Sequence, residues 1–476
     1  MTQFILWNSY CGSDNRGGLS RDLLKKDDWN IADFSTVRPL GAHQISSWLR
    51  QHGYTVVVID FSDKMSTDDL VEITKKYVDT DTIAIGVSTT FWPGNTEPLW
   101  VIEARVIIEI TYPHLKWLLG GSRETDAKRL RWIEFSSYAE DTLLSFLNEN
   151  SDHTRFDIKT SVMHYTDTDF IQPHEVLSFE LGRGCQFKCK FCRFPLIGKK
   201  PGTYIKNMHL IRDQLIEIYE RFGVTRYNFI DDTVNEDEEK IENLARLVQS
   251  LPFKLEWIGF CRADLIWSRP NTIRTLKDSG LVSTFFGIES FDSEASKIVG
   301  KGWSGKHAKE FLLRLKDEWG SDISMNLGLI VGIPGENLDT LDEHNEWLIS
   351  NDIGKWRWAP LFVTNKNQNS IWSSEFDRNY EKYGINFSEK DSINWHHTNC
   401  NYQQAVTKSI KLQTRAFTTL RNTGFTLSDY CTTTGADFKE SMNFKWSSLF
   451  TEQSRSHIYD SMKQTVDSYV SKHLKN

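Results

Sequence analysis

The chain of 476 residues is poor in cysteine and contains no long apolar run. Its seven cysteines are an odd number, which argues against the fully paired disulfide framework of a small secreted protein. No stretch of 18 apolar residues occurs, and the first residues lack a basic region followed by an apolar one. We therefore expect no membrane-spanning segment and no signal peptide, and we expect the protein in the reducing cytoplasm.

Charge of one sign is not in large excess either, because 56 Lys and Arg stand against 64 Asp and Glu, for a net charge of −8. This balance argues against a dedicated nucleic-acid coat, although it allows a local basic patch. Low-complexity segments and short-period repeats are absent as well. The length predicts a globular protein of two to four domains.

Three of the seven cysteines lie in one short loop, Cys185, Cys189 and Cys192, at the spacing C-x3-C-x2-C. About 0.002 such triads are expected by chance at this cysteine frequency. The preceding segment 176–181 alternates apolar and polar residues, so the loop follows a predicted strand. Three thiolates on one loop can hold three irons of a 4Fe–4S cluster and leave the fourth iron open for a small molecule. The loop could instead hold buried thiols, or a zinc site without its fourth ligand.

Residues 1–150 alternate short apolar strands with helical stretches, which predicts a parallel sheet covered on both faces, of flavodoxin-like or Rossmann-like type. The expected strands are 4–8, 55–60, 82–88, 116–120 and 131–136, and the expected helices are 43–51, 67–78, 98–111 and 140–148. Two of the strands end in small polar residues, Ser88-Thr89 and Gly120-Gly121. Such residues let a large ligand approach the backbone closely.

The remainder of the chain divides into three parts. Residues 151–175 are polar and aperiodic and predict a linker. Residues 176–365 alternate six strands with helices, which predicts an open (β/α)6 barrel with three quarters of the strands of the eight-stranded form. Residues 366–476 are predicted to be mainly helical, with amphipathic helices at 402–422 and 450–473. We expect this last segment to cover the open side of the barrel and to shape the substrate pocket.

Polar residues follow several strands of the predicted barrel, where the carboxyl ends of parallel strands share one mouth. Carboxylates there suit an ammonium group and hydroxyls, and an arginine suits a carboxylate. Two adjacent aspartates must point in opposite directions if their strand persists. Each carboxylate taken alone could instead be a helix cap or a solvated charge. The mouth residues are Asp231, Asp232, Arg262, Glu289, Ser290, Gly332 and Pro334.

The cysteine triad, with Phe191 before its last cysteine, and the ordered strand ends resemble the radical S-adenosylmethionine (radical SAM) family. This resemblance implies a 4Fe–4S cluster on the three cysteines, with SAM bound to the open iron. It implies that SAM is cleaved to a 5′-deoxyadenosyl radical, which abstracts a hydrogen atom from the substrate. It further implies that the mouth residues contact SAM and that a flavodoxin- or ferredoxin-type protein donates the electron.

Residues 1–150 are similar to the cobalamin-binding domain that precedes many radical SAM barrels. The matching pieces are 39–42, 53–60, 85–88 and 119–121. The similarity implies cobalamin contacts from Ser88, Thr89, Gly120 and Gly121. Many cobalamin proteins carry Asp-x-His-x-x-Gly after the first strand, but residues 8–14 contain no His. Bound cobalamin is therefore expected to lack a His ligand on its lower face, and a domain that binds nothing, or binds substrate, is the alternative.

The resemblance implies methyl transfer to an unactivated carbon, or a radical rearrangement. Methylthio transfer is one alternative, although such relatives carry three further cysteines in a domain where this chain has only Cys11. Cobalamin-independent radical SAM chemistry is a second, and a non-catalytic iron–sulfur protein that binds SAM or nucleic acid is a third. The basic residues around the loop are solvated charges or a surface for an anionic substrate. They are Arg183, Lys188, Lys190, Arg193, Lys199 and Lys200.

Overall fold

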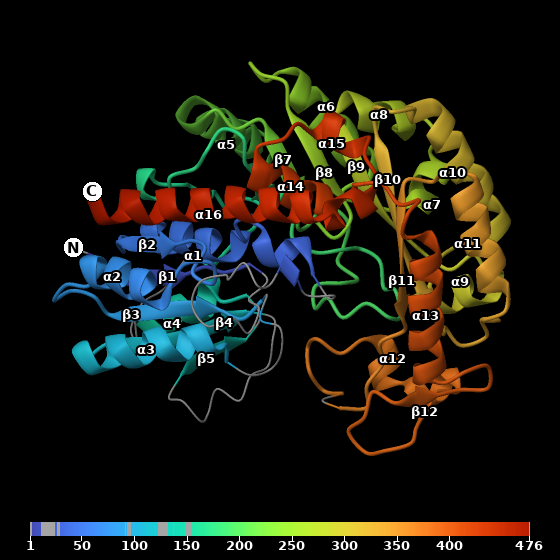
Figure 1. The fold of residues 1–476 in the computed structure, drawn as a ribbon, viewed down its shortest axis with the longest axis horizontal. Coiled ribbons are helices and arrows are strands. Elements are labelled where there is room, and N and C mark those ends of the chain that lie inside the picture. Colours follow the sequence, from blue (N-terminus) through green and yellow to red (C-terminus); the bar gives the residue numbers. More distant parts are fainter. Residues whose placement is uncertain are drawn as a thin grey trace.

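The protein is built on two parallel sheets, one of five strands and one of six (Figure 1). The structure is a computed structural model that describes residues 2–10, 24–25, 29–90, 92, 97–121, 132–136, 138–147, 155–366 and 368–475. The predicted fold class is confirmed, with an amino-terminal Rossmann-like sheet, a barrel-type sheet and a helical carboxyl-terminal region. In this part of the chain, no helix has both the length and the apolar content that crossing a bilayer requires.

The amino-terminal sheet has the strand order β2-β1-β3-β4-β5, which is the flavodoxin-like order. Its strands are apolar on both faces, as in β2, whose four residues read VVVI and are all buried. Helices α1 (Leu40–Gln51) and α4 (Glu140–Leu147) cover one face, and α2 (Thr67–Tyr77) and α3 (Leu99–Thr111) cover the other. The strands are β1 (Phe4–Trp7), β2 (Val56–Ile59), β3 (Ala84–Ser88), β4 (Lys116–Gly121) and β5 (Ile133–Ser136).

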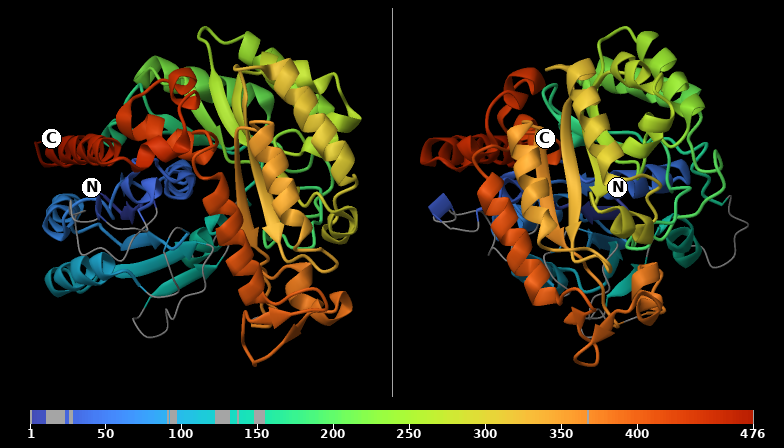
Figure 2. Two further views of the ribbon diagram at one scale, coloured as in Figure 1. Left: turned by 45° about the vertical axis from the view of Figure 1, so that its right-hand side comes forward. Right: turned by 90° about the vertical axis from the view of Figure 1, so that its right-hand side faces the viewer.

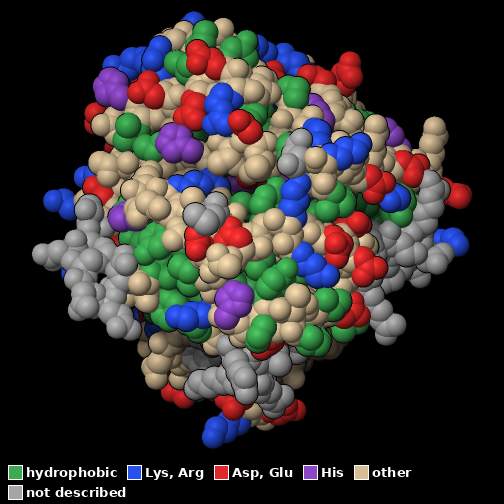
Figure 3. Space-filling model, turned by 90° about the vertical axis from the view of Figure 1, so that its left-hand side faces the viewer, with side chains coloured by type: hydrophobic (Ala, Val, Ile, Leu, Met, Phe, Trp, Pro, Cys, Tyr) green, Lys and Arg blue, Asp and Glu red, His purple; other side chains and the backbone are tan. Residues whose placement is uncertain are grey.

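The last helix of the chain, α16 (Glu452–Lys475), packs on this amino-terminal domain along α2 (Figure 1). Its apolar side chains Ile458, Met462 and Val466 share one core with Trp7 and Trp100. On the face of the domain that points away from the barrel, hydrophobic, basic and acidic side chains are interspersed (Figure 3). On that domain, α3 exposes the apolar side chains Ile102, Val106, Ile107 and Ile110.

The second sheet has six parallel strands in chain order, and its end strands β6 and β11 do not pair with each other, so the barrel is open. Helices α5 (Met208–Phe222), α6 (Glu238–Gln249), α8 (Thr272–Asp278), α10 (Gly305–Trp319) and α11 (Thr340–Ser350) follow the strands. Two short helices, α7 (Ala263–Ser268) and α9 (Ser293–Val299), were not predicted, because six or seven residues hardly show a helical period. The strands are β6 (Val176–Phe179), β7 (Arg226–Phe229), β8 (Glu256–Cys261), β9 (Leu281–Glu289), β10 (Ser324–Val331) and β11 (Lys355–Pro360).

Residues 366–476 are distributed over both halves of the molecule (Figure 2). Helix α12 (Glu375–Arg378) and the hairpin β12 (Asn386–Phe387) and β13 (Trp395–His396) follow the carboxyl end of β11. Helix α13 (Tyr402–Ala416) packs along β11, at the open edge of the barrel. Helices α14 (Phe425–Thr434) and α15 (Phe438–Met442) share an apolar cluster with residues of β6, β8 and β9. The expected cover of the open side is therefore formed by α13, whereas α16 covers the other domain.

Candidate cluster and cofactor site

The cysteine loop leaves the carboxyl end of β6 and is held by backbone hydrogen bonds. The amide of Cys185 donates to the carbonyl of Leu196 at 3.0 Å, and the amide of Lys199 donates to the carbonyl of Cys185 at 3.0 Å. The Cys185 Sγ lies 3.6 Å from Thr233 Oγ1, just beyond β7. All three cysteines are free thiols; Cys185 is buried and the other two are partly buried.

Two thiols of the loop have raised pKa values. Burial raises the pKa of the Cys185 thiol, and it raises the pKa of Cys192 to about 11, with a further upward contribution from the two neighbouring thiols. Thiols in such surroundings hold their protons until a metal replaces them. Three sulfur donors on one loop fit three irons of a 4Fe–4S cluster.

Arg262, at the end of β8, is aimed at the cysteine loop. Its Nη1 lies 3.4 Å from the Cys189 Sγ, and its guanidinium covers the Phe187 ring at 4.0 Å from the ring centroid. The same guanidinium forms a bidentate ion pair with Asp264, at 2.5 and 3.0 Å. Asn235 fixes the backbone of Arg262 from both sides, at 2.7 and 2.9 Å. A guanidinium held in place by Asp264 therefore lies beside the Cys189 sulfur.

The two adjacent aspartates after β7 have different surroundings. Asp231 is buried, accepts the amide hydrogen of Leu181 at 2.7 Å and pairs with Lys240 at 2.9 Å. Among the described residues, the Asp232 carboxyl group has no hydrogen-bond partner. Burial, reinforced by the negative charge of Asp231, raises the pKa of Asp232 to about 8. Of the two, Asp232 is the group available to a ligand, and both SAM contacts stay predictions.

Glu289 and Ser290 end β9 in a tightly held turn. Glu289 has a φ of 66°, a left-handed conformation that is rare for this residue type and typical of functional sites. Its carboxylate lies 3.5 Å from Lys301 Nζ. Ser290 Oγ donates to Glu336 at 2.7 Å, and Glu336 also accepts the amide hydrogen of Gly332 at 2.8 Å. The ends of β9 and β10 are thereby tied together.

Glu336 and Lys301 are site residues that the sequence did not single out. Glu336 is fully buried, and burial raises its pKa to about 7. Glu336 follows a Pro-Gly pair, which is typical of an exposed turn. Lys301 lies between two glycines, which is typical of a surface loop. No local pattern marks either residue, because their partners come from other strands.

The loop after β10 is packed against the carboxyl-terminal region. A Cβ at Gly332 would lie 2.6 Å from the Trp395 ring and 3.0 Å from Ala405, so only glycine fits there. His397 Nε2 lies 3.1 Å from the carbonyl oxygen of Gly332. Gly332 therefore has a packing role on this side, and the contacts of Gly332 and Pro334 with SAM stay predictions. His397 therefore contacts the backbone of this loop.

The small residues of the amino-terminal domain lie next to each other at the carboxyl ends of β3 and β4. Ser88 pairs with Gly120, and the amide of Thr89 donates to the Gly120 carbonyl at 2.7 Å. Gly121 has a φ of 136°, and a Cβ there would lie 2.6 Å from Thr89 Oγ1, so it allows two loops to meet. Among the described residues, a Cβ at Gly120 would meet only the Phe135 carbonyl oxygen, at 3.9 Å, so these residues leave room for a ligand. Thr89 Oγ1 is buried without a partner in the described part of the chain.

The same edge of the amino-terminal domain is joined to the cysteine loop. Arg183, two residues before the first cysteine, pairs with Glu140 of α4 at 2.5 Å and with Glu180 at 2.7 Å. Its guanidinium lies over the ring of Tyr138, 4.7 Å from the centroid. The Tyr138 ring also contacts Phe194, with centroids 6.5 Å apart. The end of β5 and the predicted cluster loop are therefore neighbours.

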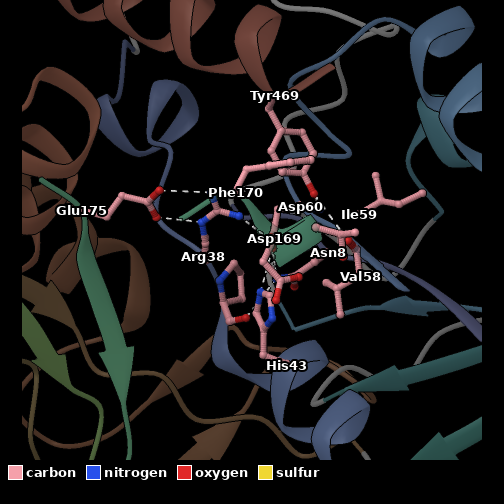
Figure 4. A network of polar contacts seen from close by, with 12 residues as sticks. Asn8, Arg38, His43, Val58, Ile59, Asp60, Asp169, Phe170, Glu175 and Tyr469 are labelled. Carbon is pink, nitrogen blue, oxygen red and sulfur yellow. Dashed lines mark hydrogen bonds and ion pairs between the residues drawn. The ribbon is translucent and has the colours of Figure 1, made fainter. Parts of the chain in front are cut away.

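At the same edge of the sheet, the space beyond β1 and β2 is occupied by side chains of the protein (Figure 4). Asp60 accepts hydrogen bonds from Arg38 at 2.5 Å and from Asn8 at 2.7 Å, and it lies 3.1 Å from His43 Nε2. The ligand atoms of His43, Asp60 and Asp169 lie within 4.8 Å of one another, as in a metal site. The Arg38 guanidinium already neutralises Asp60 and would repel a cation, so we interpret the cluster as a structural lock. His43 is structural, and Cys11 lies outside the described residues.

Comparisons with known proteins agree with this geometry. Residues 179–348 match the family model described as the Radical SAM superfamily. An uncharacterised methyltransferase of Pyrococcus horikoshii is 19% identical over 301 residues, which cover 56% of this chain and 64% of the relative. This chain thus spans slightly under two thirds of that relative's length.

Two solved structures share the fold. The radical S-adenosylmethionine methyltransferase TsrM from Kitasatospora setae, with cobalamin and a 4Fe–4S cluster bound, superposes with a TM-score of 0.57 at 12% identity. This match covers 98% of the present chain and 100% of TsrM. The cobalamin-dependent radical enzyme OxsB has a TM-score of 0.53 at 15% identity, covering 87% of this chain and 62% of OxsB. The family model is matched from β6 into α11, so this part of the chain, residues 179–348, is a radical SAM domain.

Proposed function

We propose that this chain is a radical SAM enzyme that also binds cobalamin and transfers a methyl group to an unactivated carbon. The observation that carries the proposal is the junction between the two domains. The open edge at Gly120 and the cysteine loop are brought together by the ion pair of Arg183 with Glu140 and by the ring of Tyr138. A ligand on that edge would lie beside the predicted cluster. The fold shared with TsrM along nearly the whole chain supports the same arrangement.

The family implies a 4Fe–4S cluster and SAM. Cys185, Cys189 and Cys192 would hold the cluster. When bound, these groups and cobalamin supply the electron, the radical and the methyl group that the reaction requires. Arg262 places positive charge beside the cysteine loop, which suits a carboxylate, and Glu289 with Ser290 offers oxygen acceptors on the next strand.

Asp232 is the carboxyl group best placed to receive the ammonium end of SAM. It has no partner among the described residues, and its charge affects the titration of both Cys192 and Tyr138. It follows β7, which pairs with β6, the strand that leads into the cysteine loop. A bound ammonium group would offset the carboxylates around Asp232 and favour its ionised form.

The four small residues of the amino-terminal domain would receive cobalamin. None of Ser88, Thr89, Gly120 and Gly121 carries an imidazole or a thiol, so their side chains cannot supply the usual His ligand to cobalt. The room at Gly120 and the unpaired hydroxyl of Thr89 suit a large ligand with hydrogen-bonding groups. We expect the lower face of bound cobalamin to lack a His ligand.

The test is anaerobic reconstitution with iron, sulfide and hydroxocobalamin, followed by the visible spectrum and the cobalt content of the desalted protein. The wild type should retain about one cobalamin per chain if each chain holds one site. Gly120→Trp should lose cobalamin but keep its iron, because the indole would fill the open edge. Ser145→Trp adds the same bulk on an exposed position of α4 and should change neither. If the wild-type protein retained no cobalamin, the proposal would be wrong and the function would be cobalamin-independent radical chemistry.

Two further measurements distinguish methyl transfer from methylthio transfer and from binding without catalysis. Methylthio transfer requires a second cluster, which about four irons per chain would exclude and about eight would support. Formation of 5′-deoxyadenosine from SAM under dithionite separates catalysis from mere binding of SAM or nucleic acid. Screening for SAM-dependent methylated products would then identify the substrate class.

A further inference from the structure

A cavity of about 370 Å³ lies between α10, α11 and the turn that follows β9. Both helices belong to the outer layer of the barrel, on its far side from the amino-terminal domain (Figure 1). Among the described residues, neither the cysteine loop nor the predicted SAM contacts line this cavity. Its principal lining residues are Phe291, Gly305, Lys309, Leu313, His344 and Trp347.

Three aromatic rings form one wall of the cavity. The ring centroid of Phe291 lies 5.4 Å from that of His344 and 6.0 Å from that of Trp347. Phe291 is buried, whereas His344 and Trp347 are partly exposed. A wall of this kind offers flat apolar surface against which a planar ligand can pack.

The ammonium group of Lys309 lies over the same wall. Its Nζ is 5.5 Å from the centroid of the Phe291 ring and 5.2 Å from that of Trp347. Burial lowers the pKa of Lys309, although the charge of Glu343 acts in the opposite direction. Lys309 forms no ion pair with the residues that the structure describes, whereas Lys306 at the rim pairs with Glu310 at 3.8 Å. Lys309 is therefore the cation that a ligand can neutralise.

His344 adds a hydrogen-bonding group to the cavity. Its Nδ1 is buried and has no partner in the described part of the chain. Burial and the charge of Lys309 lower the pKa of His344 to about 4, against the opposing charge of Asp292, so the ring is neutral at pH 7. A neutral imidazole nitrogen can donate or accept one hydrogen bond. A polar group of a ligand would satisfy this nitrogen.

We propose that this cavity binds a small planar carboxylate. The ring of the ligand packs against Phe291 and Trp347, and its carboxylate meets the ammonium group of Lys309. One ammonium group without an acidic partner suits one negative charge, whereas polyphosphates call for several cations or an arginine fork. The volume lies near the lower limit of ligand pockets, about 300 Å³, which suits a ligand of one or two rings. The site needs neither cobalamin nor a reaction at the barrel mouth.

The cavity shares a wall with the turn that carries Glu289 and Ser290. Phe291 directly follows this turn, and the amide of Asp292 donates to Ser290 Oγ at 3.1 Å. The Phe291 carbonyl is packed against α10, because a Cβ at Gly305 would lie 1.7 Å from its oxygen. A ligand held against Phe291 should therefore restrain the turn and slow amide hydrogen exchange in residues 286–292.

The experiment measures binding of 2-naphthoate to the reconstituted full-length protein by equilibrium dialysis. Neutral 2-naphthamide tests the need for the charge, and inorganic phosphate tests the need for the ring. Lys309→Met removes the ammonium group and keeps an unbranched side chain. The control Arg314→Met removes a cation from the same helix outside the cavity, where it pairs with Glu318 at 2.6 Å. Leu313→Trp fills the cavity with an indole.

We expect the wild type to bind 2-naphthoate about tenfold or more tightly than 2-naphthamide or phosphate, and Lys309→Met to lose this preference. Arg314→Met should bind like the wild type, and Leu313→Trp should bind neither ring compound. Equal affinities for the carboxylate and the amide in the wild type, or unchanged affinity for 2-naphthoate in Lys309→Met, would overturn the site. Displacement of 2-naphthoate by SAM would place it at the barrel mouth and would overturn the site as well. Because the assay requires no turnover, a failure of cobalamin binding or of methyl transfer would leave its result unchanged.

Discussion

Replacing Arg38 by Met should loosen the contact between the amino-terminal domain, the linker and α16. Arg38 pairs with Asp60 at 2.5 Å and with Glu175 at 2.7 Å, and the three side chains are between 0% and 3% exposed. His43 Nε2 lies 3.1 Å from the same Asp60 carboxylate, and the Asp60 amide donates to the Tyr469 hydroxyl of α16 at 2.9 Å (Figure 4). One guanidinium therefore neutralises two buried carboxylates that belong to different segments.

The expected magnitude follows from the burial. Removing one partner of a buried ion pair costs about 3–5 kcal/mol, because the remaining charge is left without compensation. Since about 1.4 kcal/mol corresponds to a factor of ten, the lower limit predicts a rise of about 100-fold in local opening. Exposed ion pairs contribute under about 1 kcal/mol, so Arg415→Met, which removes an exposed partner of Glu346, is a matched control.

Hydrogen–deuterium exchange with mass spectrometry measures this opening locally, which suits a protein of several domains. Peptides from β2, from residues 166–175 and from α16 should exchange about 100-fold faster in Arg38→Met, while the barrel strands should not change. The triple variant Arg38→Met/Asp60→Asn/Glu175→Gln should recover part of the protection, because it buries no uncompensated charge. Exchange in Arg38→Met within about threefold of the wild type would refute the reasoning.

Four further outcomes are expected. Changing Cys185, Cys189 and Cys192 together to Ala should remove the cluster absorbance and lower the iron content from about four per chain to background, and a retained cluster would disprove the ligand assignment. Glu289→Gln should weaken SAM binding in equilibrium dialysis at unchanged iron content; unaltered affinity would make Glu289 structural. Although burial opposes it, His43 and Arg38 hold the pKa of Asp60 well below its usual range. Stability should therefore be lost as the pH falls below about 4, and Asp60→Asn should lose less over that range in urea titrations. Burial raises the pKa of Glu336 to about 7, so the folded state binds a proton that the unfolded state has released, and stability should fall as the pH rises from about 4 to 7. Glu336→Gln should flatten that slope.

The sequence alone predicted most elements of both sheets, because each strand and helix carries its own period of apolar residues. Strands such as 56–59 and 84–88 were located to within two residues at each end. The cysteine motif could also be recognised from the sequence, since all three residues lie in one local segment. The candidate mouth residues lie at the carboxyl ends of β7 to β10, as the order of the predicted strands indicated, and their contacts with SAM stay predictions.

Tertiary structure decided which side chains are free. The sequence could say that Asp231 and Asp232 differ, but only the contact with Lys240 and with the Leu181 amide shows that Asp231 is occupied. Likewise, the packing of Trp395 against Gly332 involves residues 63 positions apart in the chain. Local periodicity reports that a residue is buried, and it does not report which distant group covers it.

The relation between the two domains also came only from the folded chain. The sequence of α16 predicts an amphipathic helix, but it does not indicate that α2 is the helix on which α16 packs. Arg183 reads as one basic residue among six, yet it pairs with Glu140, 43 positions earlier. Ion pairs and apolar contacts of this kind depend on distance in space, which chain order does not encode locally. The sequence thus determined the elements and the cysteine loop, and the tertiary structure determined that the loop lies against Tyr138 and Glu140, which follow the last strand of the amino-terminal sheet.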